Sequence, residues 1–202
     1  MASPKRKPHQ TESRRDNAKG RLLAAAIDFV ACHGVREHSL REIAAALDTS
    51  HRMLIYHFGS RQGLFVEIIR VMEQQQLQGL QAMVADIEAF GSTSEVMRRF
   101  WRRLADPALW PHERLFFEVY GQALQGEPHA VPLLDGIVDS WVDPAAAHGE
   151  LQGLPPRLAR ANARLDLAVV RGLLLDLLAT GDTQGVDDAM ERYIDIAAVN
   201  DV

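Results

Sequence analysis

Apolar side chains recur at helical spacing along most of the chain, which predicts an all-α fold. The first stripe runs from Leu22 to Val30, and Gly34 follows where a left-handed helix C-cap is expected, so we predict a first helix over Asn17–His33. Comparable stripes and breaks predict about nine helices in all. The later ones are expected near residues 40–47, 50–58, 61–89, 95–105, 112–125, 128–147, 155–179 and 186–199.

Residues 39–58 have the pattern of two short helices joined by a tight turn. Ser39 and Glu42 form an S-x-x-E pair, whose side chains can each accept a free backbone N–H at a helix start. A short apolar stripe follows, and Asp48-Thr49-Ser50 then interrupts it with residue types that favour turns and helix starts. This geometry is that of a helix-turn-helix, whose second helix enters the DNA major groove.

The second helix of this motif divides into two faces. Leu54 and Phe58 are four residues apart and can pack inward. The other side carries hydrogen-bond donors or aromatic edges, namely His51, Arg52, Tyr56 and His57. Such side chains suit contacts to base edges and phosphates.

The charge is divided unevenly along the chain. The total is −5, which argues against DNA binding, but residues 1–61 hold 11 Lys and Arg against 6 Asp and Glu, whereas residues 62–202 hold 11 against 21. A basic end that meets a polyanion and an acidic body that does not would have this distribution.

With these features, the chain resembles the TetR family of bacterial transcriptional regulators. The resemblance implies a phosphate contact from Ser39 and places Arg61 where a lysine usually opens the fourth helix. It also implies a recognition segment of Thr49, Ser50, His51, Arg52, Met53, Tyr56 and His57. Two positions depart from the pattern. Asp48 replaces a common turn glycine, although aspartate tolerates the left-handed backbone that such a turn needs. Ile55 replaces a tyrosine that often contacts phosphate.

The resemblance and the charge division together predict three regions. Residues 1–16 are expected to be a disordered basic arm that either follows phosphates and the minor groove or serves only as a solubilising tail. Residues 17–61 are expected to form the DNA-binding domain, and residues 62–202 an effector-binding and dimerisation domain.

Most aromatic side chains lie between Phe90 and Trp141, where they suit either an apolar ligand cavity or a filled core. The resemblance favours a cavity for a small-molecule effector. The expected lining residues are Met72, Met97, Trp101, Phe117, Tyr120 and Trp141.

Residues 167–178 are apolar around nearly the whole helix circumference and therefore need cover from protein on every side. Twelve residues with two charges are too few to span a bilayer. This helix and the last one resemble the pair that forms the family's four-helix dimer interface. The expected interface residues are Leu165, Val169, Gly172, Leu173, Tyr193 and Ile194.

Signals for catalysis, metals and membranes are missing from the sequence. The single cysteine excludes an internal disulfide, and we find no P-loop, nucleophile-elbow or zinc-protease motif and no metal-ligand spacing among the eight histidines. We therefore expect no catalytic, metal or cofactor site, and a cytoplasmic bacterial protein associated with the nucleoid. Arg98, Arg99, Arg102 and Arg103 could hold an anion, although a solvated face paired with nearby acids is the preferred interpretation.

The resulting hypothesis is a homodimeric regulator, most often a repressor in this family, that binds an inverted-repeat double-stranded operator and is released by an effector. One alternative is a DNA-binding regulator with a filled core that answers to a protein partner. A less favoured one is an all-helical enzyme or carrier.

Overall fold

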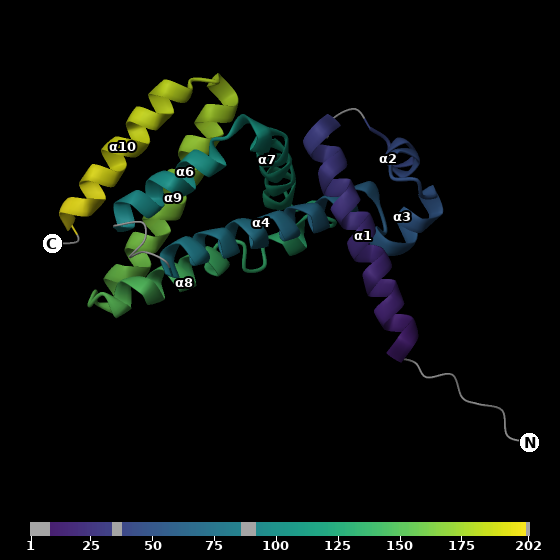
Figure 1. The fold of residues 1–202 in the computed structure, drawn as a ribbon, viewed down its shortest axis with the longest axis horizontal. Coiled ribbons are helices and arrows are strands. Elements are labelled where there is room, and N and C mark those ends of the chain that lie inside the picture. Colours follow the sequence, from purple (N-terminus) through teal and green to yellow (C-terminus); the bar gives the residue numbers. More distant parts are fainter. Residues whose placement is uncertain (1–8, 34–37, 86–91, 201–202) are drawn as a thin grey trace, which may run out of the picture.

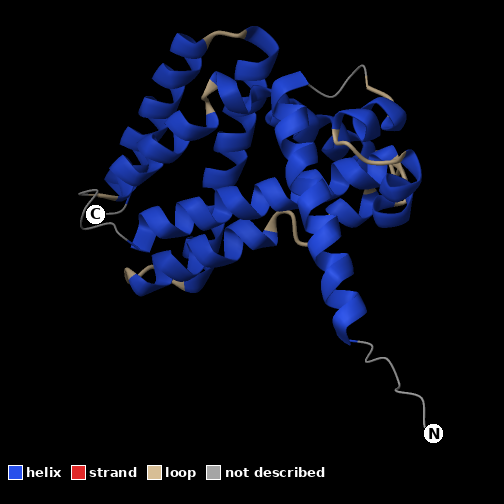
Figure 2. Cartoon of the chain, turned by 45° about the vertical axis from the view of Figure 1, so that its right-hand side comes forward, coloured by secondary structure: helices blue, strands red, loops and turns tan. Residues whose placement is uncertain are grey.

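The computed structural model describes residues 9–33, 38–85 and 92–200, with side chains from residue 17 to residue 198 of these ranges. This part of the chain folds into α-helices and two short 3-10 turns, without a strand (Figure 2). The elements are α1 (His9–His33), α2 (Leu40–Ala46), α3 (His51–Phe58), α4 (Arg61–Ala85), α6 (Thr93–Leu104), η1 (Pro107–Leu109), α7 (Trp110–Leu124), η2 (Val131–Leu133), α8 (Asp139–Leu151), α9 (Pro156–Thr180) and α10 (Thr183–Asn200). The all-α prediction is confirmed.

Helix α4 connects two groups of helices (Figure 1). One group, which we call the head, consists of α1–α3. The other, which we call the body, consists of α4 and α6–α10. Within the body, α10 packs on both α6 and α9, at the end of the molecule that is far from α3. Any change in the tilt of α4 relative to the other helices of the body therefore also moves the head.

The first helix begins earlier than the sequence indicated. Helix α1 starts at His9, so residues 9–16 of the expected disordered arm are helical. The prediction relied on apolar content alone, but this segment contains Gln, Glu and Arg and neither proline nor glycine, so a helix can extend through it. Lys5, Arg6 and Lys7 of the expected arm lie outside the described residues.

The helix-turn-helix follows from local interactions that the sequence predicts. The Ser39 hydroxyl accepts a bond from the backbone N–H of Glu42, whose carboxylate accepts one from the N–H of Ser39, so the capping box is formed. Asp48 occupies the left-handed region with φ of 49°, as its place in a tight turn requires. Ser50 then caps α3, and its hydroxyl accepts the N–H of Met53.

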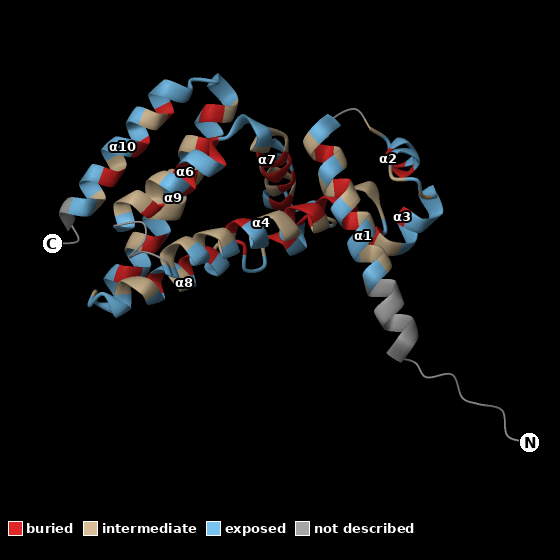
Figure 3. Ribbon diagram, viewed as in Figure 1, coloured by how far each residue is buried: buried red, intermediate tan, exposed pale blue. Residues whose placement is uncertain are grey.

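The main hydrophobic core is shared between the head and the body. Leu54 on α3, Leu64 and Ile68 on α4, and Leu115 on α7 are all fully buried within one cluster. Figure 3 shows this buried zone where α4 passes beneath α1 and α7. The core therefore has no break at residue 61, where we had expected the DNA-binding domain to end.

A second core joins α6, α8, α9 and α10, with Phe100, Trp141, Leu177 and Met190 among its members. The indole N–H of Trp101 donates to Asp187 over 2.7 Å and so links α6 to α10. These contacts hold together the end of the body that carries α9 and α10.

The prediction of one helix over residues 128–147 is wrong for the first half of that range. Pro132 lies in the 3-10 turn η2, and Gly136 has φ of 74°, a conformation that interrupts a right-handed helix. Helix α8 therefore begins only at Asp139.

Candidate nucleic-acid interface and effector cavity

The outer face of α3 is available for contact with a large partner. Its inner face is fixed by Leu54 and Phe58, while His51 and Arg52 are exposed and Tyr56 is 56% exposed. Met53 and Ile55 are exposed as well. The structure thus places most of the predicted recognition segment on one accessible surface, which also includes Ile55.

Ser39 and Ser50 lie at the edges of this surface with part of their hydrogen-bonding capacity in use. Each hydroxyl accepts a backbone N–H, at 3.3 Å for Ser39 and 3.2 Å for Ser50. A hydroxyl that accepts such a bond still has its own O–H to donate. Both serines therefore remain able to donate to a phosphate, and Thr49 lies half-buried beside Ser50.

Two predicted DNA contacts occupy less accessible positions. The Nε2 atom of His57 is buried without a hydrogen-bond partner among the described residues. Arg61 donates from Nε to the carbonyl oxygen of His38 over 2.9 Å, and its guanidinium lies 4.4 Å from the centre of the Phe65 ring. Arg61 therefore ties the entrance of α2 to the start of α4.

Arg41 is an exposed cation that the prediction of site residues left out. It is on the solvent face of α2, two residues after Ser39. A basic residue on the outward face of the first helix in the motif was the signal in the sequence, since such residues commonly contact phosphates.

The body contains a cavity between α4, α6, α7, α8 and α9. The space not filled by atoms in this cavity is about 680 Å³, with the open solvent at its mouth counted in. Its apolar lining includes Leu80, Met97, Phe100, Leu104, Phe116, Trp141, Leu167, Val170 and Leu174. Its polar lining consists of Glu73, Gln76, Glu113, Asp166 and Arg171.

Glu73 and Arg171 form an ion pair at one side of this cavity. An Arg171 guanidinium N–H donates to Glu73 over 3.2 Å, and the indole N–H of Trp141 donates to the same carboxylate oxygen over 2.9 Å. Burial raises the pKa of Glu73, while the positive charge of Arg171 opposes that rise. Arg171 also donates to the carbonyl oxygen of Ile137 over 3.0 Å and lies over the Phe116 and Tyr120 rings, so its donors are largely engaged.

Glu113 is the more deeply buried carboxyl group of the cavity. Only 3% of the residue is exposed, and the side-chain amide of Gln76 donates to it over 2.6 Å. Burial raises the pKa of Glu113 to about 7, and the negative charge of Glu73 adds to this shift, whereas the bond from Gln76 and the charge of Arg171 oppose it. This group therefore changes charge near neutral pH.

Three of the six predicted ligand-binding residues line the cavity or the small space beside it, and the other three do not. Met97 and Trp141 line the cavity, and Met72 lines a small adjoining space beside Glu113. Trp101, Phe117 and Tyr120 are not part of the lining, because Trp101 turns toward Asp187 on α10 and Tyr120 stacks on Phe116. Phe117 packs between the two hydrophobic cores.

The polar residues of the cavity were missed at the sequence level. Gln76 and Glu113 each continue the apolar stripe of their helix, since Gln76 follows Ile69 and Met72 and Glu113 precedes Phe116 and Tyr120. A polar side chain at a core position is informative because burying it is costly. That signal was present for both.

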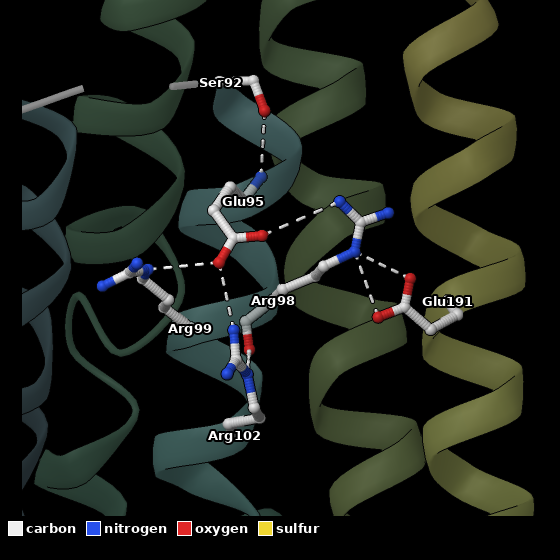
Figure 4. Close-up of polar contacts among 6 residues, drawn as sticks. All are labelled: Ser92, Glu95, Arg98, Arg99, Arg102 and Glu191. Atoms are coloured by element: carbon white, nitrogen blue, oxygen red, sulfur yellow. Dashed lines mark hydrogen bonds and ion pairs between the residues drawn. The ribbon is translucent and has the colours of Figure 1, made fainter. Parts of the chain in front are cut away.

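The arginine face of α6 is the paired, solvated surface that the sequence favoured. Arg98 donates to Glu191 on α10, and Arg99 and Arg102 both pair with Glu95 (Figure 4). Glu95 also belongs to the start of α6, where its N–H donates to the hydroxyl of Ser92. Three of the four arginines are therefore paired with carboxylates of the protein itself and need no anionic ligand.

An exposed apolar stripe runs along α9. Leu165 and Leu175 are 55% and 51% exposed, and Ala168 and Gly172 lie between them on the same face. Val169, Leu173 and Tyr193, also expected at the dimer interface, are half-buried. Ile194, also expected at the dimer interface, is 3% exposed and packs into the core with Met190, whereas Ile196 is exposed on α10.

The described residues offer neither a metal site nor a membrane span. These residues contain no group of three or more His, Cys, Asp or Glu that could hold a metal ion. None of the helices described is both long enough and apolar enough to cross a membrane.

The capped two-helix motif with its exposed α3, mounted on an all-helical body, defines a helix-turn-helix DNA-binding regulator. Residues 22–68 match the family model described as bacterial regulatory proteins, tetR family. A search of curated protein sequences gives no match.

Solved structures share the fold over nearly the whole chain. A transcriptional regulator from Rhodococcus sp. has a TM-score of 0.68 at 22% identity, covering 91% of this chain and 98% of its own. A TetR transcriptional regulator from Legionella pneumophila has a TM-score of 0.64 at 18% identity, with 88% and 95% covered. A regulator from Saccharomonospora viridis, solved in complex with choline, has a TM-score of 0.63 at 23% identity, with 89% and 94% covered.

The head and the start of α4 are therefore similar to bacterial regulatory proteins of the tetR family, and the chain shares its overall fold with solved transcriptional regulators. Members of that family are DNA-binding regulators rather than enzymes.

Proposed function

We propose that the protein is a homodimeric transcriptional repressor that binds an inverted-repeat operator and is released from it by a small-molecule effector. The observation that carries the proposal is the outer face of α3, where Arg52, Met53 and Tyr56 are exposed on a helix whose inner face is locked by Leu54 and Phe58. A rigid helix with donors on its outer face suits the major groove.

Dimerisation is supported by the stripe on α9. Leucines exposed at Leu165 and Leu175, with the small residues Ala168 and Gly172 between them, allow two copies of the helix to approach closely. A two-fold pairing through this face and α10 would present two α3 helices to one duplex, with half-sites separated by about 34–36 Å or a multiple of that distance.

An effector is favoured over a filled core because the body has an open cavity with buried charged groups. Its walls come from α4, which carries the head, and from α7, whose His112 Nε2 lies 3.3 Å from the carbonyl oxygen of Ile27 on α1 and donates to it. A ligand that binds more tightly to one tilt of α4 and α7 would shift the population of head positions, with a coupling of typically ~1–3 kcal/mol. The regulator from Saccharomonospora viridis, which holds choline, supports a small-molecule ligand for this fold.

The test begins with selection of bound fragments from genomic DNA, followed by fluorescence anisotropy with the selected operator. Arg52→Ala is expected to weaken operator binding by about 1–3 kcal/mol, the usual cost of losing a base contact. The matched control is Arg157→Ala, because Arg157 is an exposed arginine on α9. Equal operator affinity of the folded Arg52→Ala and control proteins would remove α3 as the recognition surface.

A further inference from the structure

We infer that the cavity of the body takes a small organic cation, whose ammonium group binds at Glu113 while its apolar part lies against Phe100, Phe116 and Trp141. This inference rests on the proposed function, because it names the chemical class of the effector for the same cavity.

The charges around Glu113 come from three helices. Helix α4 contributes Glu73, and α9 contributes Arg171 and Asp166. Arg171 is paired with Glu73, so these two groups leave no net charge, and Asp166 accepts the phenolic O–H of Tyr193. On α7 itself, the neighbouring His112 donates from Nε2 to the Ile27 carbonyl oxygen.

Glu113 has no ion-pair partner among the described residues, because Arg171, whose charge reaches it, is already paired with Glu73. Its hydrogen bond among the described residues comes from a neutral amide, that of Gln76. A buried carboxylate in such surroundings is unfavourable unless it binds either a proton or a positive charge. The pKa of about 7 shows that the proton is held only weakly at neutral pH, so a cation can replace it.

The rest of the lining suits an ammonium ion with an apolar substituent. The Phe100 and Trp141 rings are 5.8 Å apart between centres, and Phe116 stands on the same face of α7 as Glu113. Aromatic faces carry a negative quadrupole and attract cations, quaternary ammonium groups in particular. Their apolar surface also covers the organic part of such a ligand.

Anionic and neutral ligands are less well matched to these residues. An anion would need the guanidinium of Arg171, which already donates to Glu73 and to the Ile137 carbonyl oxygen. It would also lie in a cavity lined by three carboxyl residues, Glu73, Glu113 and Asp166. A neutral acceptor could bind the protonated form of Glu113, but such a ligand would bind better at low pH, which is the opposite of the behaviour expected for a cation.

Cation binding at Glu113 should therefore displace a proton. The Glu113 carboxylic acid loses its proton to solvent, and the carboxylate then pairs with the ammonium group. With a pKa of about 7 for the free protein, the ionised fraction rises about tenfold between about pH 6 and about pH 8, and the affinity for the cation should rise by the same factor. At about pH 7 roughly half a proton should be released per cation bound.

The position of Glu113 also suggests how binding reaches the head. Its neighbour His112 contacts α1 through the Ile27 carbonyl oxygen, and the other ring nitrogen of His112, Nδ1, is buried without a partner among the described residues. Only 6% of His112 is exposed, and it lines a very small space beside the cavity together with Glu113 and Met72. A cation at Glu113 would act on the turn of α7 that touches the head.

The experiment compares three probes of similar size by isothermal titration calorimetry on the full chain. Benzyltrimethylammonium has a permanent positive charge, neopentylbenzene is its neutral isostere, and benzylsulfonate is an anion of similar shape. We expect the cation to bind most tightly, with about tenfold higher affinity at about pH 8 than at about pH 6. Titrations in two buffers with different ionisation enthalpies measure the released proton.

Two variants make the test specific. Glu113→Gln keeps the shape but cannot ionise, so it should lose the preference for the cation and the pH dependence of its binding. Glu118→Gln changes an exposed carboxylate on the same helix and should behave like the unaltered protein. Equal or tighter binding of the neutral or anionic probe, no binding of the cation, or unchanged binding by Glu113→Gln would overturn the inference.

Operator release separates this inference from the proposed function. If the cation binds as described but the operator stays bound, the inference that the ligand is a cation is supported, and the proposal that it releases the operator is refuted. If a neutral or anionic probe binds the cavity and releases the operator, the effector role stands and the ligand class is wrong.

Discussion

Replacing Glu113 by glutamine removes a buried ionisable group while keeping its shape and its contact with Gln76. In the native protein the pKa of Glu113 is raised from 4.5 to about 7, mainly because burial disfavours the charged form. The folded state therefore holds a proton that the unfolded state has already released between these two pH values. Folding stability is unaffected below about pH 4.5, falls as the pH rises towards about 7, and then levels off.

The size of this effect follows from the shift. A change of about 2.5 pH units in a pKa corresponds to about 3 kcal/mol of lost stability above neutral pH. Because glutamine cannot ionise, Glu113→Gln should be more stable than the unaltered protein by up to about 3 kcal/mol at about pH 8, and the two should differ little at about pH 4.5.

Urea unfolding followed by circular dichroism, at one protein concentration and several pH values, measures this difference. Glu118→Gln is the matched control, since Glu118 is on the same helix but exposed. Parallel loss of stability in Glu113→Gln and the unaltered protein across the neutral range would refute the reasoning. It would mean that Glu113 is not held in its protonated form.

Three further substitutions test other parts of the structure. Ser39→Ala removes the α2 cap and should lower the free energy of unfolding by about 1 kcal/mol in urea titrations, so an unchanged midpoint would contradict the capping box. Asp48→Val should cost about 1–2 kcal/mol in the same assay because of its positive φ, whereas Asp48→Gly should cost nothing. Leu175→Arg should yield monomers in sedimentation velocity, while Leu151→Arg, at an exposed leucine of α8, should not; a dimer that survives Leu175→Arg would place the interface elsewhere.

The helix-turn-helix could be predicted in detail because its signals are local. The Ser39–Glu42 capping box spans four residues, and the residue type of Asp48 is enough to predict the turn at that position. Residues 9–16 were missed for the complementary reason, since a helix without an apolar stripe leaves no periodic signal.

The cavity could be predicted only in outline, because its polar groups meet across long distances in the sequence. Glu73 and Arg171 are 98 residues apart, and Gln76 and Glu113 are 37 apart. Which helix faces meet depends on packing that a single sequence does not encode in its periodicity. The same limit applies to α10, which has apolar residues on two faces: the sequence does not say which face packs into the core, and Ile194 is on the face that does.

The continuous core around α4 sets a rule for building chimeric regulators. Exchanging recognition specificity by joining the first 61 residues of one such protein to the remainder of another would separate Leu54 from Leu64 and Ile68, against which it packs. A working graft would have its junction beyond Ile69 and would also need a donor α1 whose surface fits the recipient α7 near Ile27 and His112. Substitution of the outward side chains of α3 alone is the more economical route to a new operator, because that change leaves every buried contact in place.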